Sequence, residues 1–234
     1  MSTDDAIPTY GRAVVSPSDD VIAGSYGTWR LSLTVGKHGI DDSGRILIAR
    51  RMAANWGLPQ FDRPAEAEYT TVTASGSAVL SARYDPRAYI RPWRGAVVID
   101  VTDGALCPGD TVTVTFGDTC GGGPGSQSQT FRQERYEFRV LVDAHGTGQY
   151  VPLAQQPWVR IVGAEAARLR LRCPSEVTVG EEFAVAVVAE DRYGNPADGF
   201  TGRVDLWAEG GEQPLATHRY APAERGAHRF EGLH

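Results

Sequence analysis

Apolar residues alternate with polar ones in short runs along most of the chain, and this period of two restricts the fold more than any other feature. In WRLSLTV, residues 29–35, every second residue is apolar, and TVTVTF (111–116) and YEFRVLV (136–142) repeat the pattern. Successive side chains of a strand point to opposite faces, so the alternation predicts half-buried strands. We expect at most one helical turn, at 50–56, and further strands at 45–49, 69–74, 78–84, 96–102 and 158–162.

Turn-forming residues separate these runs. The 234 residues include 27 glycines and 14 prolines, and turn sequences occur at 36–39, 41–44, 103–104, 108–110 and 118–125. Strands at this spacing, without helices between them, are typical of a sandwich rather than of a parallel α/β sheet. The sequence therefore predicts an all-β fold, with a larger β-sandwich domain over residues 1–162.

A second unit is expected to begin at Gly163. Leu169, Leu171 and Cys173 alternate as one inward face, and further alternating runs follow at 183–187 and 204–206. The order strand, VGEEF, strand, DRYGNP, GFTGRVDL resembles bacterial immunoglobulin-like modules, in which the Asn-Pro pair closes a tight connection because proline cannot extend a ladder.

The range 163–234 is shorter than the roughly 100 residues and seven strands of a complete immunoglobulin-type sandwich. We therefore expect a smaller, incomplete immunoglobulin-like module that lacks its final hairpin. Unpaired strand edges in such a module would make self-association possible.

The charge of the chain disfavours nucleic acid as a partner. The formal net charge is −6, Lys37 is the single lysine, and the arginines are scattered. Binding to phosphates needs clustered Lys and Arg. Arg168, Arg170 and Arg172 share one side of a strand, which we interpret as a solvated face.

Neither terminus nor interior predicts a membrane location. The first ten residues, MSTDDAIPTY, lack the basic start and apolar run of a signal peptide, and no run approaches the roughly 20 apolar residues of a span. We expect a cytoplasmic protein. Cys107, Cys120 and Cys173 fit neither a disulfide framework nor a zinc spacing, and free thiols are expected, although Cys107 and Cys120 flank one strand and could approach each other.

No catalytic or metal-binding motif is recognisable. The five histidines form no His-x-His or His-Glu-x-x-His pattern, so local spacing predicts no metal site and each is expected on the surface or in a loop: His38, His145, His218, His228 and His234. The glycine-rich stretch 117–131 lacks the Lys-Ser/Thr ending of a phosphate loop. We expect a flexible hairpin or interdomain loop there, with a docking loop as the alternative.

Two aromatic clusters are the candidate contact sites. Arg91-Pro92-Trp93-Arg94 combines stacking area with a fixed donor fork, as binding hot spots do. Trp56, Gln60 and Phe61 form the second cluster. The alternative is that these aromatics plug the ends of the sandwich. The residues predicted to contact a ligand or another domain are Arg91, Trp93, Trp56, Gln60, Gly123 and Gln129.

Residues 10–162 resemble a specific family. YGRAVVSP, AGSYGTWRLSLTVGKHGIDDSGRILIA, WGLPQFDRP, RPWRGAVVIDVTDGALCPGDTVTVTFGD and GGGPGSQSQTF are similar to the N-terminal region of a bacterial domain-of-unknown-function family. The C-terminal half of those long chains resembles the PHP (polymerase and histidinol phosphatase) metal-dependent phosphoesterases. The resemblance places the family's metal ligands in that half, and no position of this chain matches them. It therefore implies no cofactor in this chain, and a divalent metal only in the catalytic domain.

Three hypotheses of function remain at this stage. The first is a non-catalytic accessory or scaffold region that packs on a C-terminal catalytic domain and shapes access to it. The alternative is a free-standing binding module for carbohydrate or a surface ligand. The third is an enzyme with its site inside the first domain, although no active site is visible in the sequence.

Overall fold

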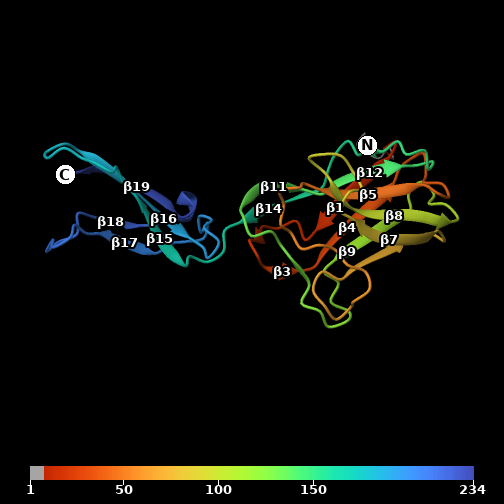
Figure 1. Cartoon of the computed structure of the whole chain (residues 1–234), viewed down its shortest axis with the longest axis horizontal. Coiled ribbons are helices and arrows are strands. Elements are labelled where there is room, and N and C mark those ends of the chain that lie inside the picture. The colour runs from red at the N-terminus through yellow and green to blue at the C-terminus, as the bar shows by residue number, and fades with distance from the viewer. Residues whose placement is uncertain (1–7) are drawn as a thin grey trace, which may run out of the picture. The chain divides into compact units, whose positions relative to one another are not determined.

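The chain is all-β and divides into two compact units (Figure 1). The computed structural model describes residues 8–234, where the only helical element is the 3-10 turn η1 (Pro222–Glu224). The first unit holds the residues up to Gln129 and Glu134–Arg160, and the second holds Thr130–Gln133 and Ile161–His234. The all-β class is confirmed. The boundary lies close to the expected Gly163, but the assignment of Thr130–Gln133 to the second unit was not foreseen.

Two antiparallel sheets dominate the first unit. One has the order β1-β4-β9-β6, and its strands are β1 (Gly11–Ser16), β4 (Trp29–Val35), β9 (Thr111–Phe116) and β6 (Thr70–Ala74). The other has the order β13-β12-β5-β8-β7, and its strands are β13 (Val151–Pro152), β12 (Arg139–Asp143), β5 (Arg45–Arg50), β8 (Gly95–Asp103) and β7 (Val79–Asp85). Smaller sheets pair β10 (Ser126–Gln127) with β3 (Tyr26–Gly27), and β14 (Trp158–Val162) with β11 (Gln133–Glu137) and β2 (Val21–Ile22).

Strand alternation determines the core of the first sheet. In β4 the residues at 29, 31, 33 and 35 are buried while those between them are not, and Leu31 and Leu33 pair with Val114 and Val112 of β9. The expected period of two is confirmed here. The sequence YEFRVLV, expected as one strand, instead divides between β11 and β12, although its alternate residues Tyr136, Phe138, Val140 and Val142 are all buried.

Strands β5 and β8 are buried on both faces, so alternation is lost in them. Leu47, Ala49 and Val98 form one apolar cluster with Ala96 and Leu141 on this sheet. Residues of the 88–93 loop, including Tyr89 and Trp93, pack against that cluster. This packing fixes the position of Trp93, one of the predicted contact residues.

The second unit consists of two small sheets. One has the order β15 (Arg168–Arg172), β16 (Phe183–Glu190) and β19 (Ala227–Leu233), and the other pairs β17 (Arg203–Leu206) with β18 (Ala216–Arg219). Its buried core is formed by Val185, Val187, Val204, Leu206, Tyr220, Phe230 and Leu233. β15 contributes no residue to this cluster.

The expected inward face of β15 is not buried. Leu169 and Leu171 pair with Ala189 and Val187, so they lie on the core side of the sheet, yet they are 45% and 56% exposed. Cys173 is also exposed. The expectation that these residues form an inward core face is therefore wrong, because the core cluster lies over β16 and β19 and does not reach the edge strand.

The arginine side of β15 was expected to be a solvated face, but two of its arginines form ion pairs with β16. Arg168 and Arg170 remain about half exposed, but their guanidinium groups pair with Glu190 at 2.9 and 2.8 Å. Glu190 is almost fully buried. A buried carboxylate needs charged partners, so these two arginines hold β15 against β16.

We predict that truncating Leu171 and Leu206 to alanine will have very different effects. Leu206 is buried in the core of the second unit, so Leu206→Ala should lower the free energy of unfolding by roughly 2–3 kcal/mol. Leu171→Ala should change it by less than about 0.5 kcal/mol. Chemical denaturation of both variants checks this, and equal losses would show that β15 is covered in solution.

Two sequence expectations concern the cysteines and membrane-spanning segments. Cys107, Cys120 and Cys173 are all exposed free thiols, as expected. Residues 8–234 include no helix with the length and apolar character needed to cross a membrane.

Candidate functional site

Two of the predicted contact residues lie in the interior of the first unit. Trp56 is 5% exposed, and its ring packs against those of Trp29, Tyr136 and Phe138, with centroids 4.6, 4.8 and 5.7 Å away. Its Nε1 donates a hydrogen bond to Ser126 Oγ at 3.0 Å. Gln129 is fully buried. Trp56 thus lies inside the first unit and not on its surface.

Gln60 and Gly123 lie in loops that are fixed by contacts with other segments of the first unit: Gln60 by hydrogen bonds and Gly123 by close packing. Gln60 Nε2 donates to the carbonyl oxygens of Arg63 and Ala67 at 2.8 and 3.2 Å, and its Oε1 accepts from the Arg63 amide at 2.9 Å. Gly123 is buried so closely that a Cβ there would lie 2.6 Å from the carbonyl oxygen of Glu66. The glycine-rich stretch therefore packs against the 64–66 segment. Gln60 and Phe61 also line an open groove of about 510 Å³.

Two guanidinium groups lie near the partly exposed ring of Trp93 in the first unit. The Cζ atoms of Arg51 and Arg139 lie 5.7 and 5.5 Å from its ring centroid. Such contacts between a cation and an aromatic face contribute about 0.5–1 kcal/mol at exposed sites. Arg91, the other residue predicted in this segment, is exposed nearby in sequence. The structure thus supports a polar-aromatic surface at Trp93 but separates it from buried Trp56 and Gln129.

A groove of about 560 Å³ begins at Arg139, the residue that stacks on Trp93. Trp158 lines the groove and is 46% exposed, and Arg135 Cζ lies 5.6 Å from its ring centroid. We call this surface the Trp-Arg groove; its defining residues are Arg135, Glu137, Arg139, Gln155, Gln156 and Trp158.

The floor of the Trp-Arg groove is preformed. Gln156 accepts a hydrogen bond from the Val140 amide at 2.7 Å and donates to the carbonyl oxygens of Val140 and Leu153 at 3.1 and 2.9 Å. Arg139 also pairs with Glu137 at 3.2 Å. With two arginines and one glutamate, the lining carries a net positive charge. It can therefore stack a planar group and bind a carboxylate at the same place.

Sequence reasoning missed the residues of this groove. The strand at 158–162 was expected, and Val159 and Ile161 are fully buried, so Trp158 had to point outward. An aromatic residue on the outward side of an amphipathic strand was the available signal. Nothing in the sequence showed that Arg135 and Arg139 would lie beside it.

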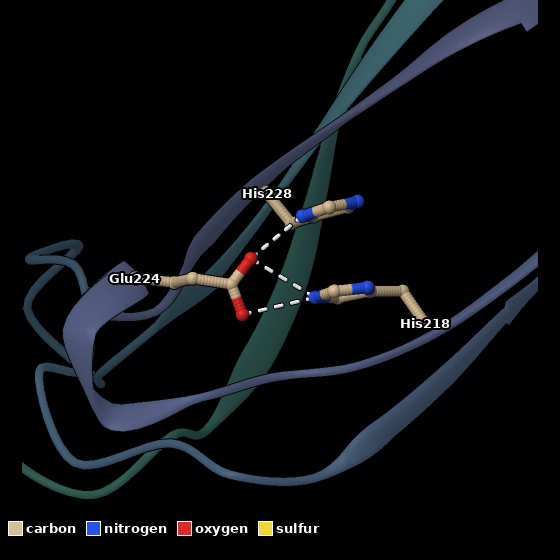
Figure 2. Close-up of side chains that lie close together, drawn as sticks. All are labelled: His218, Glu224 and His228. Carbon is tan, nitrogen blue, oxygen red and sulfur yellow. Dashed lines mark hydrogen bonds and ion pairs between the residues drawn. The ribbon is translucent and has the colours of Figure 1, made fainter.

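A second group of side chains comes together in the second unit. Figure 2 shows the imidazole rings of His218 and His228 side by side, with the Glu224 carboxylate facing them. The rings are parallel within 7°, with centroids 3.4 Å apart. His228 Nδ1 lies 2.7 Å from Glu224 Oε1, and His218 Nε2 lies 2.9 Å from both carboxylate oxygens.

The fold fixes Glu224 in this group. It ends the 3-10 turn η1, and its Oε2 accepts a hydrogen bond from the Ala221 amide at 2.7 Å. That hydrogen bond and those from His218 and His228 lower the pKa of Glu224 to about 2, against a smaller opposing effect of burial. The side chain is therefore a carboxylate throughout the neutral range.

These three residues could hold a metal ion. Each offers one ligand atom, and these atoms lie within 4.8 Å of one another. The expectation of no metal in the chain depended on a search for local spacings and on the family resemblance. That search could not find this group, because His218 lies on β18, His228 on β19 and Glu224 in the turn between them.

Comparisons with known proteins give little more. No protein-family model and no curated protein matches the sequence. Among solved structures, the chain is similar to a cohesin module from a family 33 glycoside hydrolase of Clostridium perfringens, with 15% identity and a TM-score of 0.38. That match covers 67% of this chain and 99% of the cohesin module. A TM-score this low supports no inference about the present chain.

Proposed function

We propose that this chain is a non-catalytic accessory region of a larger metal-dependent hydrolase of the PHP-like kind, and that the Trp-Arg groove is its docking surface. The observation that supports a docking function is the continuous surface in which Arg139 links Trp93 to the groove containing Trp158. The nature of the partner rests on the family resemblance of residues 10–162.

The composition of the groove suits recognition of another protein. Trp and Arg are enriched among the residues that dominate binding energies, because they combine large stacking areas with directed donors. The groove also requires little ordering on binding: Gln156 is fixed by three hydrogen bonds, and Trp93 packs on the core. Preformed surfaces lose less side-chain entropy when a partner binds.

The partner should present acidic and planar groups to this surface. The lining has a net positive charge, and each tryptophan already stacks on a guanidinium group. In this proposal the partner is the catalytic domain, which would hold the divalent metal and carry out the hydrolysis. The accessory region would orient that domain and shape the approach of substrate.

The test measures binding between this chain and the separately produced catalytic region that the proposal expects to be encoded after the His234 codon. We expect Trp158→Ala to weaken binding by at least about tenfold, since truncated hot-spot residues commonly cost 2 kcal/mol or more. Trp207→Ala is the matched control, because Trp207 is also about half exposed but lies in the second unit. Calorimetric titration of both variants measures the effect. Unchanged affinity of the Trp158 variant, or no binding by the unmodified chain, would refute the proposal.

A second candidate function is binding of a carbohydrate. The exposed ring of Trp158 beside Gln155 and Glu137 offers an apolar face with polar side chains at its edge. Aromatic surfaces with a few placed polar groups are common in small-ligand sites. Affinity electrophoresis through gels that contain soluble polysaccharides tests this. Retardation that is lost in Trp158→Ala and kept in Trp207→Ala would favour a carbohydrate ligand over a protein partner.

A further inference from the structure

We propose that His218, Glu224 and His228 form a binding site for a divalent transition-metal ion, with Zn²⁺ as the best-suited ion. The site lies in the second unit, apart from the Trp-Arg groove in the first, and does not depend on the function proposed above. It would link the two sheets of the second unit through one ion.

The two histidines occupy positions where a core residue is expected. His218 pairs with Val204 across β17 and β18, and His228 pairs with Val187 across β16 and β19. Both valines belong to the buried core. Facing pairs on a strand ladder point to the same side of the sheet, so both imidazole rings point between the sheets.

The presence of two histidines at positions that usually hold apolar side chains calls for an explanation. The His218 and His228 side chains are 27% and 25% exposed, so most of each imidazole group is withdrawn from water. That loss of hydration costs free energy, whereas burying an aliphatic side chain there would not. Here the two rings stack on each other, and a nitrogen of each lies at hydrogen-bond distance from the Glu224 carboxylate. A metal ion between these three side chains would use the imidazole nitrogens and the carboxylate together.

The donor atoms lie close enough together to share one ion if the two imidazole rings turn. Zinc binds His nitrogen at about 2.0–2.1 Å, so neighbouring ligand atoms of a tetrahedral site are about 3.3 Å apart. The two nitrogens now lie 2.7 and 2.9 Å from the carboxylate oxygens. Binding would open these contacts by roughly half an ångström. It would also turn the two parallel rings so that both nitrogen lone pairs, which lie in the ring planes, point at one ion.

The types of ligand select the class of ion. Two imidazole nitrogens and one carboxylate suit Zn²⁺ and other first-row transition metals, whereas Mg²⁺ and Ca²⁺ prefer oxygen ligands alone. The three side chains are 24–27% exposed, so solvent can reach the group. With three ligands from the protein, at least one coordination position would be filled by water or by another molecule.

The surroundings hold the ligands in place. The Ala221 amide fixes the Glu224 carboxylate, and Tyr220 Oη donates to the carbonyl oxygen of Val187 at 2.7 Å, which ties the β18–β19 connection to the central strand. Phe230 and Tyr220 lie against the rings, with centroids 4.8 Å from His228 and 5.4 Å from His218. Supporting contacts of this kind orient metal ligands and raise affinity.

The experiment titrates the EDTA-treated full chain with ZnCl₂ by calorimetry and with CoCl₂ by visible absorption. We expect one ion per chain and, with Co²⁺, the absorption bands of a site with nitrogen and oxygen ligands. His228→Gln and Glu224→Gln should each weaken binding by more than about tenfold, since even loss of an outer-shell contact commonly costs 10–100-fold. His145→Gln is the control, because His145 also contacts a carboxylate, Asp41 Oδ2 at 2.7 Å, but in the first unit.

The variants separate metal binding from a structural hydrogen-bonded cluster. If His228→Gln unfolds the second unit, Glu224→Gln in the turn provides the same test, and circular dichroism identifies which variant is folded. Equal uptake by the unmodified chain and a folded Glu224→Gln variant would overturn the proposal, as would the absence of uptake by the unmodified chain. Loss of uptake in His145→Gln would move the site to the first unit and overturn it equally.

Discussion

Replacement of Asp191 by alanine should lower the free energy of unfolding of the second unit by about 3–4 kcal/mol. Asp191 is fully buried at the end of β16 and accepts hydrogen bonds from the amides of Ala164, Tyr193 and Asn195 and from Asn195 Nδ2, at 2.8–3.0 Å. Alanine would leave these donors without an acceptor. Each buried unsatisfied group costs about 1–3 kcal/mol, although water entering the space would recover part of the loss.

The effect should extend to the segment Thr130–Gln133. Asn195, which Asp191 holds, donates through Nδ2 to the carbonyl oxygen of Thr130 and accepts through Oδ1 from the Arg132 amide, both at 2.8 Å. Loss of Asp191 frees the Asn195 side chain to rotate. Hydrogen exchange of the Arg132 amide should therefore accelerate in Asp191→Ala, in addition to the loss of stability measured by denaturant.

The contribution of Asp191 should also depend on pH with a defined sign. Burial acts to raise the pKa of Asp191, but the hydrogen bonds from Asn195 and from the Ala164 and Tyr193 amides outweigh it and lower the pKa. A carboxyl group with a lowered pKa in the folded state stabilises it fully above its unfolded pKa of about 3.9, and this contribution disappears as pH falls through the folded value. The difference in stability between the unmodified chain and Asp191→Ala should thus narrow as pH falls below about 4, because the contribution of the ionised carboxylate is lost there.

Glu231→Ala is the control for both measurements. Glu231 lies on β19 of the same unit with a side chain 75% exposed, so its removal should leave the unfolding transition almost unchanged. A loss in Asp191→Ala no greater than that in Glu231→Ala would show that the turn does not support the second unit.

The turn that contains Asp191 illustrates what the sequence could and could not show. Gly194, Asn195 and Pro196 are turn-forming residues, and they predicted a tight connection there. They could not show that the Asn195 side chain reaches Thr130 and Arg132, because that contact joins segments far apart in the sequence. The same limit explains why Thr130–Gln133 was expected in the first domain.

Periodicity predicted strands well but not what covers them. Trp29 to Val35 alternate as expected because one sheet face is buried and the other is not. Leu169 and Leu171 have the same pattern and lie on the core side, yet remain exposed, because alternation specifies a face and not the presence of a facing sheet. In β8 both faces are covered, and alternation gives no information.

The candidate sites were less accessible to sequence reasoning for a related reason. Metal motifs were sought at spacings that bring ligands together on one element. His218 and His228 instead meet because two strands of different sheets face each other, and Glu224 joins them from the connecting turn. Trp93 was found because Trp and Arg are adjacent in sequence, whereas its actual guanidinium neighbours, Arg51 and Arg139, are remote in the chain.

Replacement of Trp56 by alanine should destabilise the first unit by about 4–5 kcal/mol, near the upper end for a buried tryptophan. Its ring contacts those of Trp29, Tyr136 and Phe138, so truncation removes a shared neighbour from an aromatic cluster and leaves a cavity. The variant also loses the hydrogen bond from Nε1 to Ser126 Oγ, which in turn donates to Glu68 Oε2 at 2.5 Å.

One further substitution tests how much of this effect remains when an aromatic ring is kept, and a second serves as the control. Trp56→Phe keeps an aromatic ring but removes Nε1, so it should cost less than the alanine variant. Trp207→Ala, at an exposed tryptophan of the second unit, should leave the transition of the first unit unchanged. Denaturant unfolding followed by near-ultraviolet circular dichroism reports on the aromatic cluster directly.

The same variant decides between the two interpretations of Trp56. The sequence placed Trp56 among the contact residues, and the structure places it in the core. Trp56→Ala should therefore reduce the stability of the first unit, and any loss of affinity should result from that loss of stability. If Trp56→Ala instead remains as stable as the unmodified chain and loses affinity for the partner of the Trp-Arg groove, Trp56 is a contact residue and its buried position does not persist in solution. Trp158→Ala should have the opposite effect, because the ring of Trp158 is half exposed. Affinity should fall, while the unfolding transition changes little.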